Sequence, residues 1–198
     1  MDPRAKSRLP LFPLPVVLFP GAPMPLHIFE PRYRRMVARC LEQDRRFGLV
    51  YHDADRQGPF LTDEGRVGCV AHIEEYQPLS DGRSVLVVRG LERFRIDDGI
   101  ESEEPFYEAL VSEYADGEPD EGLPLRRART LALFRELVRT LGEEPGWLDE
   151  LDETREISFP LVRAIQAEPR WLQGFLEVGD EAVRLELLEQ IFLNLLGR

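Results

Sequence analysis

Histidine and cysteine side chains supply many of the nucleophiles, proton carriers and metal ligands of proteins, and this chain has few of them. The sequence contains three histidines, His27, His52 and His72, and two cysteines, Cys40 and Cys69. No His-x-x-x-His or Cys-x-x-Cys spacing occurs, so the sequence predicts no metal site. A Cys–His pair built on Cys40 or Cys69 would create an activated nucleophile, and an uncharacterised hydrolase is therefore one alternative function. Because both cysteines fall on expected core faces, we favour buried free thiols.

Lysine is rarer still, which bears on phosphate and peptidase chemistry. The only lysine is Lys6, in an N-terminal tail that we expect to be disordered. A P-loop needs a lysine that reaches the terminal phosphates, and a lysine-activated serine needs one beside the nucleophile. The neighbouring carboxylates of Glu74-Glu75 and Glu103-Glu104 have no histidine partner close in sequence, so we interpret them as surface charge. We therefore expect a protein that is not an enzyme and uses no cofactor.

Net charge limits the classes of partner. The 198 residues carry a formal charge of −12 with a pI near 4.8, whereas nucleic-acid binders usually present a basic face. The charge is uneven: residues 1–50 hold nine basic and four acidic side chains, and residues 101–150 hold five and fourteen. No apolar run is long enough to span a bilayer, and residues 1–8 are too charged for a signal peptide. We expect a cytoplasmic protein without membrane contact, and nucleic acid as an unfavoured partner.

The elements that must position any site begin with a proline-rich apolar stretch. Six prolines lie between Pro10 and Pro25, interleaved with leucine, valine and phenylalanine. Proline removes a backbone donor and is confined to strand edges, starts and bulges, while the apolar residues still need a core. We predict a short edge strand, a turn at Pro20-Gly21 and a second strand around Met24 to Ile28.

A helix is predicted directly after this stretch. Pro31 suits the first turn, where its missing N–H would be unpaired anyway. Apolar residues then recur with helical spacing on one face, which we expect to be buried, and four arginines take the solvent side. The apolar face comprises Tyr33, Met36, Val37, Cys40 and Leu41, and the arginines are Arg32, Arg34, Arg35 and Arg39.

Several short motifs are dispersed along the chain in a fixed order. They are Leu-Pro-Leu-Phe-Pro at 9–13, Phe-Pro-Gly at 19–21, Pro-Leu at 25–26, Ile-Phe-Glu-Pro-Arg-Tyr at 28–33, Phe-Gly at 47–48, Gly68 with Ala-His-Ile at 71–73, Asp-Gly-Arg at 81–83, and Gly90 with Arg-Phe at 93–94. Together they resemble one protein family, the amino-terminal substrate-binding domain of Lon proteases. The resemblance covers nearly the whole chain, including the helical tail near Trp171. The resemblance implies a PUA-like barrel, named after pseudouridine synthase and archaeosine transglycosylase, and a role in substrate recognition and self-association.

The residue pattern itself favours an α+β fold in two parts. Alternating apolar residues and turn signals predict several short strands up to residue 115, which together favour a small mixed barrel with one early helix. After the acidic break at 116–122 the period becomes helical. There we predict that Gly142 ends one helix, and that Ser158 and Asp180 cap two others. The expected helix faces include Leu141 and Leu195. The predicted domains are residues 1–115, the barrel, and residues 116–198, a helical bundle.

The favoured function is non-catalytic binding of unfolded or specific polypeptide segments, as an adaptor or substrate-recognition protein, with a homo-oligomer as a further expectation. An RNA- or nucleotide-binding PUA-like protein and the Cys/His hydrolase remain alternatives. We place the ligand surface near the proline-rich stretch because prolines leave strand carbonyls unpaired and basic charge is concentrated there. The alternative is that these residues only hold the fold together. The candidate binding residues are Pro20, Gly21, Pro23, Phe29, Glu30, Arg32 and Tyr33.

Overall fold

The computed structural model describes residues 6–143 and 145–198, which form two compact units. The first comprises the chain up to Ala115 together with Glu168–Glu177, and the second comprises Asp116–Ala167 and Val178–Arg198. The predicted division into 1–115 and 116–198 stays a prediction. The compact units share its boundary at 115/116 but place Glu168–Glu177 with the first part. The expectations about a tail and a signal peptide fall mainly on residues outside the described part, while Lys6 is exposed and directly precedes the first strand.

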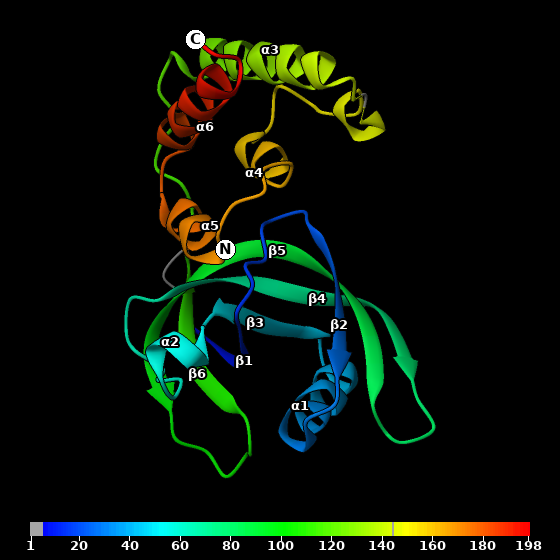
Figure 1. Ribbon diagram of the computed structural model, residues 1–198. Coiled ribbons are helices and arrows are strands. Elements are labelled where there is room, and N and C mark those ends of the chain that lie inside the picture. The colour runs from blue at the N-terminus through cyan, green and yellow to red at the C-terminus, as the bar shows by residue number, and fades with distance from the viewer. Residues whose placement is uncertain (1–5, 144) are drawn as a thin grey trace. The chain divides into compact units, whose positions relative to one another are not determined.

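The first unit is built on a six-stranded mixed sheet whose order is β2-β5-β4-β3-β1-β6 (Figure 1). Because β5 also pairs with β6, five strands close into a ring and β2 is added at its outside. This ring corresponds to the predicted barrel, and the α+β fold class is confirmed. The elements are β1 (Ser7–Leu14), β2 (Pro23–Ile28), α1 (Pro31–Glu42), β3 (Arg46–Tyr51), α2 (Ala54–Gln57), β4 (Val67–Pro78), β5 (Ser84–Ile100) and β6 (Tyr107–Glu113).

Strand β1 is an interior strand of the sheet, between β3 and β6, so its prediction as an edge strand is wrong. Its first half, Ser7–Leu11, pairs antiparallel with β6, and its second half, Leu11–Leu14, pairs parallel with β3. Each half thus has one strand partner along its own length. A proline can sit on the unpaired flank without removing a ladder hydrogen bond, which explains how Pro10 and Pro13 fit in an interior strand. The second predicted strand is confirmed as β2.

Strand β5 is one continuous element of 17 residues, and Gly90 lies near its middle. The loop before β2 folds against this point: the Gly21 amide donates to the Gly90 carbonyl at 2.8 Å, and the Gly90 amide donates to the Ala22 carbonyl at 2.9 Å. A Cβ built on Gly90 would overlap the carbonyl oxygen of Phe19. Glycine is therefore required here by the close approach of two backbones.

Helix α1 buries the face that the spacing predicts. Tyr33, Met36, Val37 and Cys40 are buried, whereas Leu41 at the end of the face is only partly covered. The Tyr33 ring packs against Phe12 with ring centroids 4.1 Å apart, which joins the helix to β1. The apolar face of α1 is therefore part of the core of the first unit.

Helix α5 (Pro169–Glu177) belongs to the first unit although it follows most of the helical segment in sequence. Phe175 meets Phe19 edge-on with centroids 6.3 Å apart. The buried Arg93 donates to the Leu176 carbonyl at 2.7 Å, and the Tyr114 hydroxyl donates to the Glu177 carbonyl at 2.8 Å. Strand β5 and the residue that follows β6 thus supply donors to the last carbonyls of this helix, which otherwise lack intrahelical partners.

The second unit is helical and contains α3 (Leu123–Leu141), the short 3-10 helix η1 (Gly146–Leu148), α4 (Ser158–Val162) and α6 (Glu181–Leu195). Gly142 ends α3 in the left-handed conformation with φ 73°, and the Asp180 side chain accepts from the Ala182 amide at 2.7 Å, so both predicted caps are confirmed. Ser158 is the first residue of α4 rather than its cap. Within the described residues, no helix is long and apolar enough to cross a bilayer.

Two predicted apolar stripes in the second unit end one turn too late. The last apolar residues predicted for α3 and α6, Leu141 and Leu195, are exposed at 63% and 62%. The buried face of α6 instead contains three charged side chains beside its leucines, namely Glu181, Arg184 and Glu189. Helical periodicity found the two helices, but it did not find that charged residues share the covered face.

Candidate functional site

Strand β2 forms the outer edge of the sheet and pairs only with β5 in the strand order of the described residues. Its side chains alternate: Pro23, Pro25 and His27 are exposed, while Leu26 and Ile28 are buried. In an antiparallel pair, alternate residues direct their backbone groups towards the partner. No hydrogen bond between β2 and β5 is lost when Pro23 and Pro25 occupy the positions whose backbone groups face away from β5. The free flank of β2 then offers carbonyl acceptors and very few donors.

An exposed apolar row runs beside this edge. Phe29 directly follows β2, and 58% of its surface is exposed. The centroid of its ring lies 5.8 Å from that of the His27 ring. The register pairs Pro25 with Val87 and His27 with Val85, which is 36% exposed. Residues opposite one another on adjacent strands share a face. Phe29, Pro25, Val85 and Val87, together with His27, therefore form a strip on the outer face, which we call the β2 strip.

Polar residues of β4 border the β2 strip on its far side. Gln77 lies opposite Val85, and Glu75 lies opposite Val87. At the loop end of β2, Arg89 donates to the Gly21 carbonyl at 3.1 Å and is bound to Glu74 by hydrogen bonds of 2.5 and 3.2 Å. The strip is thus an apolar band between a strand edge with free carbonyls and a charged border.

The structure places the seven predicted binding residues at the two ends of β2 rather than in one cluster. A six-residue strand separates its ends by about 17 Å, so the two groups do not touch a common small ligand. Tyr33 is only 2% exposed and lies in the core, whereas Phe29 is open to solvent. The group at the start of β2 is Pro20, Gly21 and Pro23, and the group after its end is Phe29, Glu30, Arg32 and Tyr33.

The buried Tyr33 supports the side chain of Arg32 from below. Its ring lies under the guanidinium of Arg32, whose Cζ is 4.6 Å from the ring centroid, and Glu30 accepts from Arg32 Nε at 2.9 Å. Burial raises the pKa of the Tyr33 hydroxyl, which is buried without a hydrogen-bond partner among the described residues. Tyr33 therefore stays neutral, and it holds Arg32 by stacking and packing.

Two arginines of α1 are paired with carboxylates of β6 and of the segment before it. Arg35 Nε donates to Glu104 at 2.6 Å, and Arg39 donates to Glu108 at 3.0 Å. Arg8 on β1 also binds Glu108, whose side chain is completely buried. Three of the nine basic residues among the first fifty, Arg8, Arg35 and Arg39, are therefore paired with two carboxylates, Glu104 and Glu108. This pairing weakens the argument from basic charge for placing the ligand surface here.

Glu108 remains ionised despite its burial. Desolvation by burial raises the pKa of this carboxyl group, but the hydrogen bonds from Arg8 and Ser102 and the charges of Arg39 and Arg8 outweigh it. The net pKa lies below the ordinary value for glutamate. Two guanidinium groups converging on one buried carboxylate form a structural tie between α1, β1 and β6.

The groups considered for covalent chemistry are arranged as core residues. Cys40 and Cys69 are free and buried, as predicted, and burial raises the pKa of the Cys40 thiol to about 12 and that of the Cys69 thiol as well. Neither thiol forms the thiolate needed of a nucleophile at neutral pH. His52 Nε2 is hydrogen-bonded to the Gly58 carbonyl at 2.8 Å. Among residues 6–143 and 145–198, no group of three His, Cys, Asp or Glu is placed to hold a metal ion.

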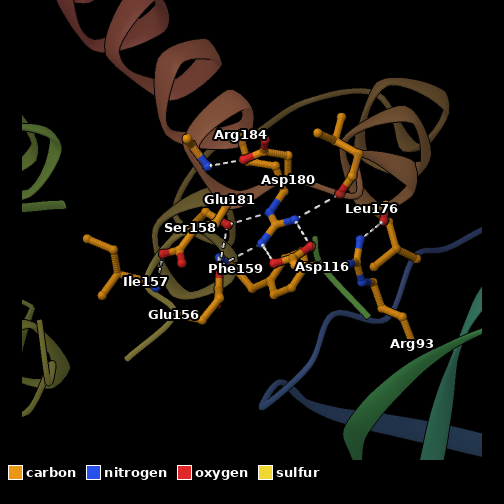
Figure 2. A network of polar contacts seen from close by, with 12 residues as sticks. Arg93, Asp116, Glu156, Ile157, Ser158, Phe159, Leu176, Asp180, Glu181 and Arg184 are labelled. Atoms are coloured by element: carbon orange, nitrogen blue, oxygen red, sulfur yellow. Dashed lines mark hydrogen bonds and ion pairs between the residues drawn. The ribbon is translucent and has the colours of Figure 1, made fainter. Parts of the chain in front are cut away.

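The sequence reasoning missed a buried polar network in the second unit (Figure 2). At its centre, the fully buried guanidinium of Arg184 makes two hydrogen bonds of 2.6 Å to Asp116. Its Nε donates to the Ser158 hydroxyl at 2.7 Å, and one terminal nitrogen donates to the Val178 carbonyl at 2.8 Å. The Phe159 ring lies 4.3 Å from the guanidinium carbon. The only hint in the sequence was one arginine on the leucine face of a predicted helix.

A second charged pair extends this network. Glu181 accepts from Arg127 at 3.0 and 2.5 Å, and also from the Ile157 amide at 3.0 Å. Glu156 binds Ser158 and the Phe159 amide, and burial raises its pKa although these hydrogen bonds and Arg184 oppose the rise. The charged groups of Arg184, Glu181 and Glu156 are all hydrogen-bonded to other protein groups. We therefore interpret this network as a structural element of the second unit.

Comparison with known proteins assigns a family to this arrangement. Lon protease of Cytophaga hutchinsonii is 27% identical over 194 residues, which are 93% of this chain and 24% of that protein. This chain spans about a quarter of the length of the curated relatives that it matches.

Two solved structures match the fold. The crystal structure of a Lon N-terminal domain protein from Xanthomonas campestris has 26% identity and a TM-score of 0.65, covering 93% of this chain and 98% of that one. The N-terminal domain of Mycobacterium avium complex Lon protease has 17% identity and a TM-score of 0.73, covering 94% and 98%. The sequence model of the ATP-dependent protease La (LON) substrate-binding domain matches residues 8–192. The chain therefore belongs to the family of Lon substrate-binding domains.

Proposed function

We propose that this protein is a non-catalytic module that binds extended segments of other polypeptides at the β2 strip. Membership of the substrate-binding-domain family supports polypeptide as the class of ligand. The observation that carries the location is the exposed row containing Phe29 and Val85 beside the free edge of β2. A strand edge next to an apolar face suits β-strand addition, in which main-chain hydrogen bonds give affinity and side-chain contacts give selectivity.

The binding mode follows from the prolines. A guest segment laid along β2 donates its amides to the carbonyls that Pro23 and Pro25 leave free, while it finds few donors in return. The guest therefore pairs at alternate positions only, and its apolar side chains on Phe29 and Val85 supply the rest of the affinity. The predicted residues Pro20 and Gly21 shape the start of this edge, and Glu30, Arg32 and Tyr33 support its end.

Fluorescence anisotropy with labelled β-casein, an unfolded protein, tests the proposal. Phe29→Ser is expected to weaken binding about tenfold, equivalent to about 1.4 kcal/mol. Leu125→Ser is the matched control, because Leu125 is an exposed leucine of the helical unit, at 77% exposure. Equal affinity of the Phe29→Ser variant and the unchanged protein, with both still folded by circular dichroism, would place polypeptide binding elsewhere or nowhere on this chain.

The biological role that fits this activity is an adaptor or recognition module in the cytoplasm. The single lysine of the chain leaves no residue for a P-loop or for a lysine-activated serine. Purified protein is therefore expected to bind β-casein without degrading it in the presence of ATP. Light scattering of the same preparation tests the proposed self-association, and a gel-shift experiment with RNA tests the nucleic-acid alternative, for which we expect no shift.

A further inference from the structure

A polar cavity of about 500 Å³ lies within the first unit, between α5 and the segments around α2. Its volume falls in the range of about 300–1,000 Å³ that is usual for small-molecule sites. Two arginines, two carboxylates and two amide side chains face the same space, which distinguishes it from an apolar packing defect. The lining residues are Tyr51, Gln57, Asp63, Arg66, Arg170, Gln173, Gly174 and Glu177.

One cavity-lining residue, Gln173, carries a buried hydrogen-bond acceptor that has no partner among the described residues. The side-chain amide nitrogen of Gln173 donates to the Val67 carbonyl at 3.0 Å and to Glu177 Oε1 at 2.8 Å. Turning the amide over would place its oxygen against these two acceptors, so the orientation is fixed. The Gln173 oxygen is then a buried acceptor that finds no donor among the described residues. A buried acceptor of this kind is costly unless a ligand or water supplies a donor.

A cation, the guanidinium of Arg66, is held in place by its own contacts at the same cavity. Arg66 donates to the Tyr51 carbonyl at 2.8 Å and to the Leu61 carbonyl at 3.2 Å, and its guanidinium carbon lies 4.7 Å from the centroid of the Phe60 ring. These contacts fix the guanidinium but use only part of its five N–H groups. Burial lowers the pKa of Arg66, with Asp63 and Glu177 opposing the change. Partial desolvation strengthens the attraction of this group for an anion.

Two further charged side chains line the cavity. Asp63 and Arg170 are exposed, and among the described residues neither side chain makes a hydrogen bond or an ion pair, although the charge of Asp63 acts on Arg66. The cavity thus offers acceptors for an ammonium group, Asp63 and the Gln173 oxygen, and donors for a carboxylate, Arg66 and Arg170. A ligand with only one of these charges would leave half of the groups unmatched.

We propose that this cavity binds a compact zwitterion, a free α-amino acid or a dipeptide, with its ammonium at Gln173 and Asp63 and its carboxylate at Arg66 and Arg170. The proposal goes beyond polypeptide binding at the β2 strip, because it concerns other residues of the same unit and a small ligand. The proposal is supported by the cavity volume, by the buried acceptor of Gln173 and by side chains of both charges around one space.

Titration with L-alanyl-L-alanine, followed by ¹H–¹⁵N NMR of the whole chain, tests the proposal. We expect saturable shifts of the Gln173 side-chain amide, with L-alanine as a second arm that separates amino-acid from dipeptide binding. N-acetyl-L-alanyl-L-alanine and L-alanyl-L-alanine amide each lack one charge and are expected to bind about tenfold or more weakly. Asp63→Asn and Arg170→Gln should each weaken the unblocked ligand by a similar factor.

Arg155→Gln is the matched control, since the Arg155 side chain is 83% exposed in the other unit, and it should leave the titration unchanged. Three results would overturn the proposal: no saturable shift with either unblocked ligand, equal binding of the blocked dipeptides, or unchanged affinity in both cavity variants. Because Phe29→Ser leaves the cavity intact, loss of β-casein binding without loss of dipeptide binding separates the two proposals.

Discussion

Asp116 and Arg184 are joined by two hydrogen bonds of 2.6 Å, although 68 residues separate them in the sequence (Figure 2). The pair connects the first residue of the second unit to the first turn of its last helix. A planar guanidinium facing a carboxylate through two parallel bonds fixes distance and orientation together. The relationship therefore sets how the two ends of the helical unit meet.

Replacing Arg184 by leucine should destabilise the protein by about 3–5 kcal/mol, because Asp116 and Glu156 would lose their buried partner. The free energy of unfolding in urea measures the loss. Arg155→Leu is the control, since it removes an exposed arginine and should change stability by about 0.5 kcal/mol or less. A loss below about 1 kcal/mol for Arg184→Leu would mean that the buried network adds little to stability.

Gly90→Ala should destabilise the first unit by about 1–3 kcal/mol, the usual cost of forcing an extra group into a packed site. The added methyl group would meet the Phe19 carbonyl and push the loop before β2 away from β5. Thermal denaturation provides the comparison with Gly174→Ala, where a Cβ meets nothing within 4 Å and a helix position favours alanine. Equal melting temperatures for the two variants would contradict the close approach.

Glu108→Gln should lower stability at neutral pH and have little effect in acid. The folded-state pKa of Glu108 is depressed, so its ionised form stabilises the protein above the unfolded pKa, near 4.3. That contribution disappears as pH falls through the folded pKa. Urea unfolding of both proteins between pH 7 and pH 3 should show curves that converge at low pH. Parallel curves would show that Glu108 is not the titrating group.

The two thiols should resist modification in the folded protein. Burial raises the pKa of Cys40 to about 12, so very little thiolate forms at pH 8, and Cys69 is equally enclosed. A disulfide reagent such as Ellman's reagent should react with both cysteines only after denaturant is added. Rapid reaction of one thiol in native protein would show that its cover opens readily.

Much of the fold could be predicted from local patterns in the sequence. Helical spacing located the buried face of α1, and the preferences of Gly142 and Asp180 located two helix ends, because these features depend on residues close in sequence. The position of β1 inside the ring was not accessible in this way. Its two halves pair with β6 and β3, and those partners lie far along the chain.

The candidate site was less accessible than the fold. The seven candidate binding residues stay a prediction: among them Phe29 is open to solvent, whereas Tyr33 lies in the core, as the helical spacing of its own segment predicted. Val85 and Val87 were overlooked because their exposure follows from pairing with β2 rather than from their own segment. The Arg184 network escaped for the same reason, since Asp116 and Ser158 become its neighbours only after folding.

The placement of α5 has a consequence for how the protein is made. Glu168–Glu177 completes the first unit, but residues 116–167 leave the ribosome first. At about 5–20 residues per second, α5 therefore emerges seconds after the strands that it covers. During that interval the side chains of Arg93 and Tyr114 lack their acceptors, because Leu176 and Glu177 have not yet been synthesised. The surface of the sheet that α5 later covers is thus accessible to chaperones and proteases while residues 116–167 are being synthesised.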